Sequence, residues 1–276
     1  MKGSIEDLEV ELLLEAIRRR YGHDFRHYSR PSLSRRLEQA MTRMGCSDLS
    51  SLQGRVLRDA SLFSTLLQTI TVGTSEMFRD PDYFLALREQ VLPVLRTYPS
   101  RKVWVAGCST GEEVYSLCIL LEESGLLDRT IVYATDINPA SLLKASRGIF
   151  PIADMAKNTQ NYQRAGGKRS FSSYYTVDYD SALFDRRLAR NVVFSDHDLA
   201  TDAMFAEVQL VSCRNVLIYF DRPLQDRAIS LFCDCLSPRG FLGLGSYETL
   251  RASPHDAAFE PVAPTERLFR KRTAVA

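Results

Sequence analysis

Apolar residues in the first 70 positions recur at helical spacing, and no segment there alternates as a strand does. One apolar face consists of Ile5, Leu8, Leu12 and Ala16. A second begins after Ser29 and Pro31, ends at Gly45, and consists of Leu33, Leu37, Ala40, Met41 and Met44. Two further helical runs lie near 48–58 and 60–69. The pattern predicts an all-helical N-terminal domain over residues 1–70.

From residue 80 onward, short apolar runs alternate with longer amphipathic ones. The predicted strands are 102–106, 130–135, 191–195, 208–213, 241–246 and 266–271. The predicted helices are 82–97, 112–124, 138–147 and 222–236. This alternation predicts a mostly parallel sheet with helices on both faces, hence an α/β second domain over residues 82–276. Residues 71–81 link the two domains, and Pro81 marks the start of the first helix.

One segment of the second domain departs from this alternation. Residues 166–190 begin with two glycines and are rich in aromatic and β-branched residues. That composition predicts a small inserted subdomain of antiparallel strands. A long surface loop is the alternative.

A glycine-punctuated loop follows the first predicted strand. Gly107 and Gly111 stand between the apolar run 103–106 and a helical run that begins at Glu112. This arrangement lets the backbone approach a nucleoside closely. The loop is neither a P-loop nor a complete G-x-G-x-x-G, so it favours a ligand without phosphate, such as S-adenosylmethionine; a plain strand–helix turn is the alternative. Asp136 ends the next strand, 25 residues after Gly111, where a ribose partner belongs in a Rossmann-like unit.

Composition and charge narrow the function classes. With 35 Lys and Arg against 34 Asp and Glu, the net charge of +1 gives no reason to expect nucleic acid or a membrane surface as partner. The apolar runs are too short to span a bilayer, and acidic residues interrupt any signal peptide. The six cysteines form no C-x-x-C pair, so we expect no zinc site. We also expect the protein to be located in a reducing cytoplasm.

Three further motifs identify a family. They are I-T-V-G-T-S-E-M-F-R-D at 70–80, S-D-H-D-L at 195–199 and S-C-R-N-V-L-I-Y-F-D at 212–221. Together with the segments 106–113 and 134–138, they closely resemble the chemotaxis receptor methyltransferases, CheR. The resemblance runs in order from about residue 8 to residue 272. C-R-N-V-L-I-Y-F-D is its most specific part.

The resemblance implies a protein-glutamate O-methyltransferase that uses S-adenosylmethionine and releases S-adenosylhomocysteine. Its implied partner is the cytoplasmic helical region of chemoreceptors, with recruitment to membrane receptor arrays and sensory adaptation as its role. We expect a monomer that contacts neither nucleic acid nor the membrane interior. A methyltransferase acting on a sensor in another signalling pathway is one alternative. An adaptor that binds the cofactor without turnover is another.

The resemblance also assigns cofactor contacts. Asp136 would accept from the ribose hydroxyls, with a helix N-cap as its alternative role. Glu113 would face the amino group of the methionine moiety, whereas Glu112 fits a first-turn helix residue. Asp198 would accept from the adenine amine and Leu199 would offer its backbone, although relatives often carry Asn at the former position. The remaining expected contacts are Gly73, Ser75, Arg79, Arg214 and Asn215, with Gly73 limited to its backbone.

Arg79 and Tyr219 match the residues that would orient the reacting groups. A glutamate carboxylate is already ionised at neutral pH, so the nucleophile needs no general base. Arg79 would bind the cofactor carboxylate, or orient the incoming glutamate by a forked hydrogen bond, and an interdomain salt bridge is its alternative role. The Tyr219 hydroxyl would position the substrate carboxylate, and an aromatic core position is its alternative role.

Arginines dominate the segment between Ala16 and Gly45, with eight against two acidic residues. Arg36 and Arg43 lie two helical turns apart and flank the apolar face of their helix. We expect them to dock an acidic receptor helix by charge complementarity, with a solvated helix face as the alternative. In some relatives the β-subdomain grips a receptor C-terminal tether. The sequence leaves open whether residues 166–190 do so here.

Overall fold

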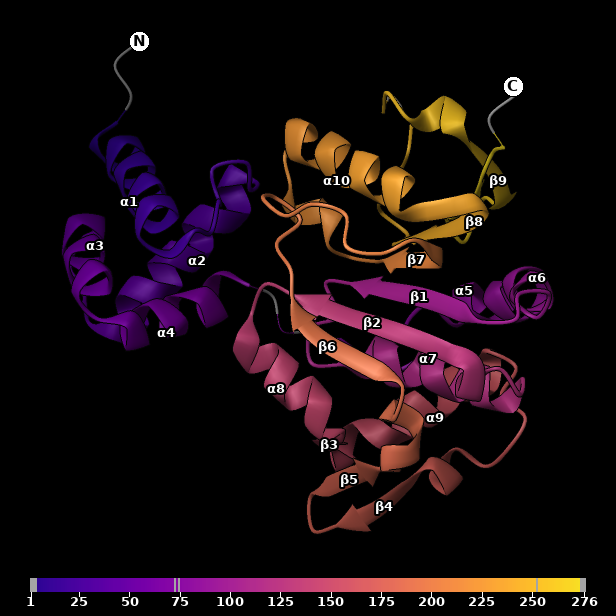
Figure 1. The fold of residues 1–276 in the computed structure, drawn as a ribbon. Helices are drawn as coiled ribbons and strands as arrows, with labels where there is room; N and C mark the ends of the chain where they lie inside the picture. The colour runs from indigo at the N-terminus through magenta and orange to yellow at the C-terminus, as the bar shows by residue number, and fades with distance from the viewer. Residues whose placement is uncertain (1–3, 72, 74, 252, 274–276) are drawn as a thin grey trace.

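A computed structural model describes residues 4–71, 73, 75–251 and 253–273 (Figure 1). Four helices form the N-terminal part, to the left of the sheet in Figure 1. They are α1 (Ile5–Tyr21), α2 (Arg30–Met44), α3 (Leu49–Arg58) and α4 (Ala60–Ile70). The prediction of an all-helical N-terminal part is confirmed.

Local hydrogen bonds explain where these helices begin and end. Ser4 and Asp7 form a reciprocal capping box at the start of α1, and Gly22 ends this helix in the left-handed conformation, with φ 83°. The side chains of Asp48 and Asp59 cap α3 and α4 by accepting from backbone amides. The helices enclose a core that includes Leu13, Leu14, Ile17, Leu37, Leu52, Val56 and Leu66, so this part has its own apolar centre.

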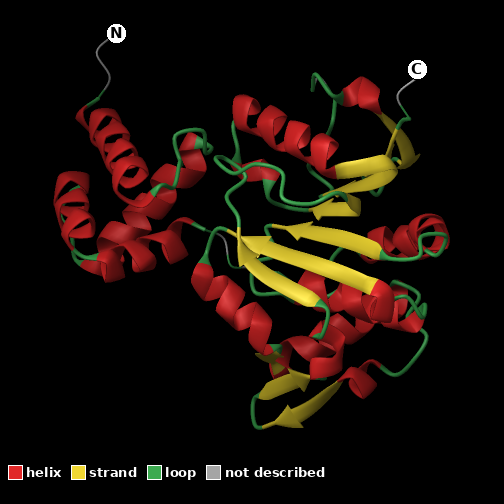
Figure 2. Cartoon of the chain, viewed as in Figure 1, coloured by secondary structure: helices red, strands yellow, loops and turns green. Residues whose placement is uncertain are grey.

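The second part is built on a seven-stranded sheet, drawn in yellow in Figure 2. Its strands are β1 (Arg101–Ala106), β2 (Thr130–Asp136), β6 (Val192–Asp196), β7 (Val208–Cys213), β8 (Leu236–Leu244), β9 (Phe259–Ala263) and β10 (Leu268–Lys271). The order is β6-β2-β1-β7-β8-β10-β9. The first five strands pair in parallel, whereas β10 and β9 add antiparallel strands at one edge. The prediction of a mostly parallel sheet is confirmed.

Two details of the sheet differ from the sequence prediction. β8 begins at Leu236, five residues before the predicted 241, and β9 was not predicted at all. The segment Ser-Pro-Arg-Gly resembles a turn, and indeed the β7–β8 register shifts between Val208 and Leu210, while Arg239 has φ 63°. The prediction missed the irregular start of this strand, because proline and a left-handed residue are typical of turns.

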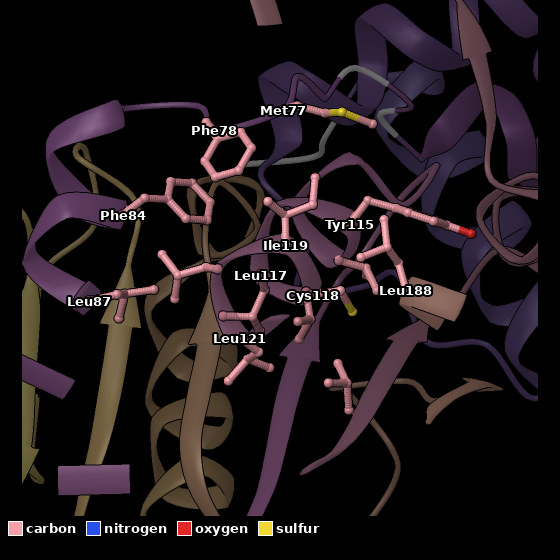
Figure 3. Packing of buried hydrophobic residues seen from close by; sticks show 14 of the residues in the cluster. Met77, Phe78, Phe84, Leu87, Tyr115, Leu117, Cys118, Ile119, Leu121 and Leu188 are labelled. Carbon is pink, nitrogen blue, oxygen red and sulfur yellow. The ribbon is translucent and has the colours of Figure 1, made fainter. Parts of the chain in front are cut away.

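Helices cover both faces of this sheet (Figure 2). They are α5 (Pro81–Ala86), α6 (Leu92–Leu95), α7 (Glu112–Glu123), α8 (Pro139–Arg147), α9 (Met155–Arg164) and α10 (Arg222–Cys235). The predicted helix 82–97 is interrupted by a π-helical turn at Leu87–Val91, because Pro93 lacks the amide that would bond Glu89. Figure 3 shows one core, where Leu117 and Leu121 of α7 pack near Phe84 and Leu87. On the opposite face, α10 packs against Trp104, Val211 and Leu242.

A small antiparallel sheet lies below the main one in Figure 1. It consists of β3 (Ile149–Pro151), β5 (Ser181–Phe184) and β4 (Tyr175–Asp178). The prediction of inserted antiparallel strands is confirmed, and the alternative of a long loop is wrong. The boundary 166 was too late, since β3 and α9 precede it and the short β3 pairs only with β5. No helix among the described residues is long and apolar enough to cross a membrane.

Candidate functional site

The strand order creates a crevice at the carboxyl ends of the central strands. β1 lies between β2 and β7, so the chain leaves β1 in one direction and later returns on its other side. Ligands of open α/β sheets bind outside the carboxyl ends of the strands at such a reversal. A cavity opens there, lined by Tyr28, Arg36, Ile70, Thr71, Ser75, Arg79, Gly107, Cys108, Ser109, Glu113, Asp136, Ile137, Ser141, His197, Asp198, Leu199, Arg214, Asn215, Val216, Tyr219 and Phe220.

The loop after β1 forms the floor of the cavity. The amides of Gly107 and Cys108 both donate to the Thr135 carbonyl, at 2.8 and 2.9 Å, which ties the loop to β2. A Cβ on Gly107 would lie 2.4 Å from Val216 Cγ2, and one on Gly111 would lie 2.9 Å from the Ala145 backbone. Both glycines also have positive φ, so close approach and conformation each require glycine.

Asp136 lies at the end of β2 and faces the cavity. Its Oδ2 accepts from the Ser109 amide at 2.8 Å and its Oδ1 accepts from the Asn138 amide at 2.9 Å. Burial raises the pKa of Asp136, and these amide donors oppose that shift. The N-cap of α8 is Asn138, so the helix-cap alternative for Asp136 is wrong. The carboxylate is thereby held in the lining of the cavity.

Glu113 and the buried Arg214 form an ion pair in the wall of the cavity. Glu113 accepts from Ser212 Oγ at 2.6 Å and from Arg214 Nη1 at 3.1 Å. Arg214 also donates to Asp80 at 2.7 Å and stacks over the Tyr83 ring, 4.2 Å from its centroid. Glu112 does not line the cavity and accepts from the Thr110 hydroxyl. Only Glu113 of these two neighbouring acids therefore lines the cavity, as the sequence predicted. Arg214 thus orients Glu113 and fastens the linker.

The linker between α4 and α5 carries Arg79 to the cavity. The Met77 amide donates to Asn158 Oδ1 at 3.2 Å, and the Phe78 amide donates to Ser116 Oγ at 2.8 Å. Within the described residues, the Arg79 side chain makes no ion pair, so its predicted alternative role as an interdomain salt bridge finds no support. Ser75 also lines the cavity. Gly73, by contrast, is exposed and is not among the lining residues.

The helical domain closes the cavity near Tyr219. Arg36 places its guanidinium over the Tyr219 ring, 4.8 Å from the centroid, and donates to the Ile70 carbonyl. Tyr28 adds a second aromatic wall, 5.0 Å from Phe220 between ring centroids. Tyr219 itself is half-buried and lines the cavity, in a short 3₁₀ helix, Leu217–Tyr219. Residues from both domains therefore surround the tyrosine.

This geometry corrects the prediction that Arg36 and Arg43 form one exposed docking face. Arg36 is only 9% exposed, because its side chain turns inward toward Tyr219 and Ile70. Arg43 is exposed in the last turn of α2 and does not line the cavity. A docking role therefore stays a prediction for Arg43, and Arg36 belongs to the wall of the cavity.

The residues directly after β6 form another wall of the cavity. Asp198 and Leu199 are buried there, and His197 packs edge-on against Trp104 with ring centroids 5.3 Å apart. Asp198 Oδ1 accepts from the Ala200 amide at 2.8 Å. Four buried polar atoms of the lining have no hydrogen-bond partner among the described residues: Ser109 Oγ, His197 Nδ1, Asp198 Oδ2 and Arg214 Nε. Because buried polar atoms are normally bonded, these four indicate where a polar ligand binds.

The charges of the lining match S-adenosylmethionine. Glu113, Asp136 and Asp198 present carboxylates to the cavity, which suit an ammonium, ribose hydroxyls and an amine. Arg79 provides a positive group for a carboxylate. Glu113 would hold the amino group, Asp136 the ribose and Asp198 the adenine, so the residues present fit this cofactor.

Sequence reasoning missed several residues of the site. Tyr28 and Ile70 come from the helical domain and Thr71 begins the linker; the last two were quoted within a motif but given no role, and none of the three side chains has a chemical signature that points to a cofactor. His197 was quoted within a motif but given no role, although its position between two acids at a strand end was a usable signal. Glu248 was also missed, and it bonds the loop that carries Asn215.

Comparisons with known proteins agree with this geometry. Residues 8–71 match the CheR methyltransferase all-alpha domain, and residues 73–266 match the CheR methyltransferase SAM-binding domain. The chain is 56% identical to the putative methyltransferase Cher3 of Pseudomonas putida, over 96% of this chain and 97% of that protein. It is 30% identical to a chemotaxis protein methyltransferase of Listeria innocua, over 89% and 92%. It is 28% identical to the probable biofilm formation methyltransferase WspC of Pseudomonas putida, over 84% and 54%.

Proposed function

This chain belongs to the CheR methyltransferase family, whose members bind S-adenosylmethionine, and we propose that it methylates glutamate side chains on the helical bundle of a chemoreceptor. The products are glutamate methyl esters and S-adenosylhomocysteine. Sensory adaptation follows, because methylation replaces a negative charge with a neutral ester on the receptor.

One observation carries this proposal: Arg79 and Tyr219 line the same cavity as the three carboxylates that suit the cofactor. A guanidinium and a phenol O–H are donors that orient a carboxylate, and the guanidinium has no acceptor to offer an amine nucleophile. Arg36 lies over the Tyr219 ring and keeps it in the wall of the cavity. The site is therefore suited to an incoming glutamate.

The residues act by holding and orienting rather than by moving protons. Bound S-adenosylmethionine supplies an electrophilic methyl group on a positively charged sulfur. Arg79 and Tyr219 donate to the glutamate carboxylate and direct one oxygen along the line of attack, which lowers the barrier through orientation. Tyr28 and Phe220 keep water from the reacting atoms. No residue needs to remove a proton, since the carboxylate is already ionised.

The test is transfer of labelled methyl from S-adenosylmethionine to receptor-rich membranes, with volatile label released by mild base. Glutamyl esters release methanol under these conditions, whereas N-methyl groups remain bound. We expect base-labile label with the wild type and a loss of at least tenfold with Arg79→Ala. Arg43→Lys is the matched control, because this exposed arginine does not line the cavity.

Calorimetry with S-adenosylhomocysteine separates the alternatives. Intact binding without any label on receptor membranes would contradict the proposed substrate and favour another protein sensor or a non-catalytic adaptor. Label that survives base would contradict ester formation itself. Equal labelling by the wild type and Arg79→Ala would contradict the role of this arginine.

A further inference from the structure

A buried carboxylate outside the cavity bonds the loop that carries two of its residues. Glu248 is 4% exposed and follows β8 in the tight turn 245–248. Its Oε2 accepts from the Asn215 amide at 3.1 Å and from the Gly245 amide at 2.5 Å, and its Oε1 accepts from the Val216 amide at 2.8 Å. Glu248 does not line the cavity, and it forms no ion pair with any described residue.

The loop that Glu248 bonds has an unusual backbone. Asn215 has φ 62°, a left-handed conformation that costs free energy for a residue other than glycine. The Leu217–Tyr219 3₁₀ helix follows at once, and the side chains of Asn215 and Tyr219 both enter the cavity wall. A small shift of this backbone would therefore move both side chains.

The two segments also meet too closely for any side chain at position 245. A Cβ on Gly245 would lie 2.8 Å from the Asn215 nitrogen and 2.8 Å from Glu248 Oε2. This close contact brings the carboxylate within reach of the amides on the other segment, 33 and 32 residues away in sequence. The arrangement joins the end of β8 to the loop after β7.

A carboxylate in this environment is costly, since burial raises the pKa of Glu248 and its amide donors only oppose that shift. An apolar residue would avoid the cost but would leave the amides of Asn215 and Val216 without their acceptor. A carboxyl group at this position therefore has one evident use, which is to accept from several amides at once.

We propose that Glu248 is a positioning residue for methyl transfer, which holds Asn215 and Tyr219 in their reactive places through the backbone amides of their loop. The inference rests on the proposed function only for its kinetic consequence. The geometric consequence, an ordered loop over 214–219, holds whatever the substrate is.

The experiment compares Glu248→Gln with Glu248→Asp. Glutamine has the shape of glutamate but turns an NH₂ group toward amide donors, whereas aspartate is shorter but still accepts. We expect Glu248→Gln to lower kcat for labelled methyl transfer at least tenfold, by a larger factor than it weakens S-adenosylhomocysteine binding. Glu248→Asp should retain more activity than Glu248→Gln. A role in packing alone predicts the reverse order and would overturn the inference.

Glu123→Gln is the matched control. This carboxylate is also buried, far from the cavity; it pairs with Arg88, unlike Glu248, and accepts from the Lys168 amide and the Tyr174 hydroxyl, at 2.9 and 3.0 Å. It should lower the melting temperature without changing kcat per folded molecule. If both glutamine variants reduce kcat only in proportion to the unfolded fraction, Glu248 is merely structural and the inference is wrong.

Hydrogen–deuterium exchange keeps the test independent of the substrate. Amides of residues 215 and 216 should exchange at least tenfold faster in Glu248→Gln and at the wild-type rate in Glu123→Gln. Faster exchange with no methyl transfer by the wild type would support the positioning and contradict the proposed function. Unchanged exchange would overturn the positioning, whatever the activity.

Discussion

The carboxyl groups of the helical domain and those around the cavity lie in opposite environments. Asp48 is half-buried and Asp59 is exposed; both accept from the first amides of α3 and α4, and the serine hydrogen bonds lower the pKa of both. Asp136 and Glu248 also accept backbone amides, but burial raises the pKa of each. The same chemical group therefore stabilises the fold in one region and is held at a cost in the other.

The contrast indicates which residues the fold needs and which the function needs. An N-cap side chain accepts from amides in the first turn of its own helix, and this hydrogen bond needs no ligand. A buried acid at a strand end loses hydration and regains it only in part from amides. Where a protein accepts that cost near orphaned polar atoms such as Ser109 Oγ, a ligand site is the physical reason.

Exchanging the two kinds of acid for alanine gives the sharpest test of this contrast. Asp136→Ala should weaken S-adenosylhomocysteine binding about a hundredfold, or about 3 kcal/mol, because a charged acceptor and its two amide bonds are lost together. Asp48→Ala should lower the free energy of unfolding by about 1 kcal/mol and leave binding unchanged. Calorimetry and urea denaturation measure the two effects.

Asp196→Ala is the control for Asp136→Ala. Asp196 lies beside Asp136 in the β2–β6 register, but it is exposed and does not line the cavity. It should leave binding within twofold of the wild type. Equal losses in the two variants would show that charge at this sheet edge, and not the placed carboxylate, governs affinity.

Two left-handed glycines extend the comparison to the backbone. Gly22 has φ 83° with nothing within 4 Å of a built Cβ, whereas Gly111 has φ 100° and its Cβ would meet Ala145 at 2.8 Å. Gly22→Ala should therefore lower the free energy of unfolding by about 1 kcal/mol, because only the left-handed conformation is unfavourable for alanine there. Gly111→Ala should cost about 2 kcal/mol or more and weaken cofactor binding, since overpacking adds to strain. Similar unfolding free energies for both variants would contradict the importance of the close approach.

Much of this contrast could be predicted from local sequence. Helix faces and glycine ends lie within a few residues of one another, so periodicity located α1 to α4. Strand–glycine–helix order located Asp136, and the family resemblance assigned Glu113. The inserted sheet was only half found, because β3 has three residues and acquires its pairing from β5 across 30 residues of chain. Short strands have too few positions to show a period.

The rest of the site depends on contacts between distant segments. The spacing of Arg36 and Arg43 predicted a shared face, but no local pattern reports that Tyr219 and the Ile70 carbonyl lie within reach of Arg36. Glu248 likewise acts on amides more than 30 residues earlier. Motif resemblance recovered most of the expected cofactor residues that line the cavity, Gly73 excepted. Residues that act through another residue were visible only in three dimensions.

The two arginines of α2 test whether the helical domain contributes to chemistry as well as docking. Arg36→Lys should lower kcat about tenfold, because a buried guanidinium over an aromatic ring contributes about 1–2 kcal/mol and lysine cannot reproduce its planar contact. Arg43→Glu should raise KM for receptor at low salt and leave kcat unchanged, since that side chain is exposed. Steady-state kinetics at two salt concentrations separates these effects, and a KM effect from Arg36→Lys alone would return it to a docking role.

Acidification should produce the smallest effect, and it acts on the two regions in opposite directions. The raised pKa of Asp136 means that it gains a proton while the pH is still above the ordinary aspartate value of 3.8, so cofactor affinity should fall several-fold as the pH approaches that value from neutrality. Its protonation relieves a buried charge, so this group makes folding more favourable over the same range. The lowered pKa values of Asp48 and Asp59 mean that their stabilisation is complete above 3.8 and is lost only below it. Affinity should therefore decline at a higher pH than the melting temperature does, and Asp136→Asn should remove much of the early decline. A simultaneous fall of both quantities would show that unfolding, and not the cavity carboxylate, sets the acid limit of binding.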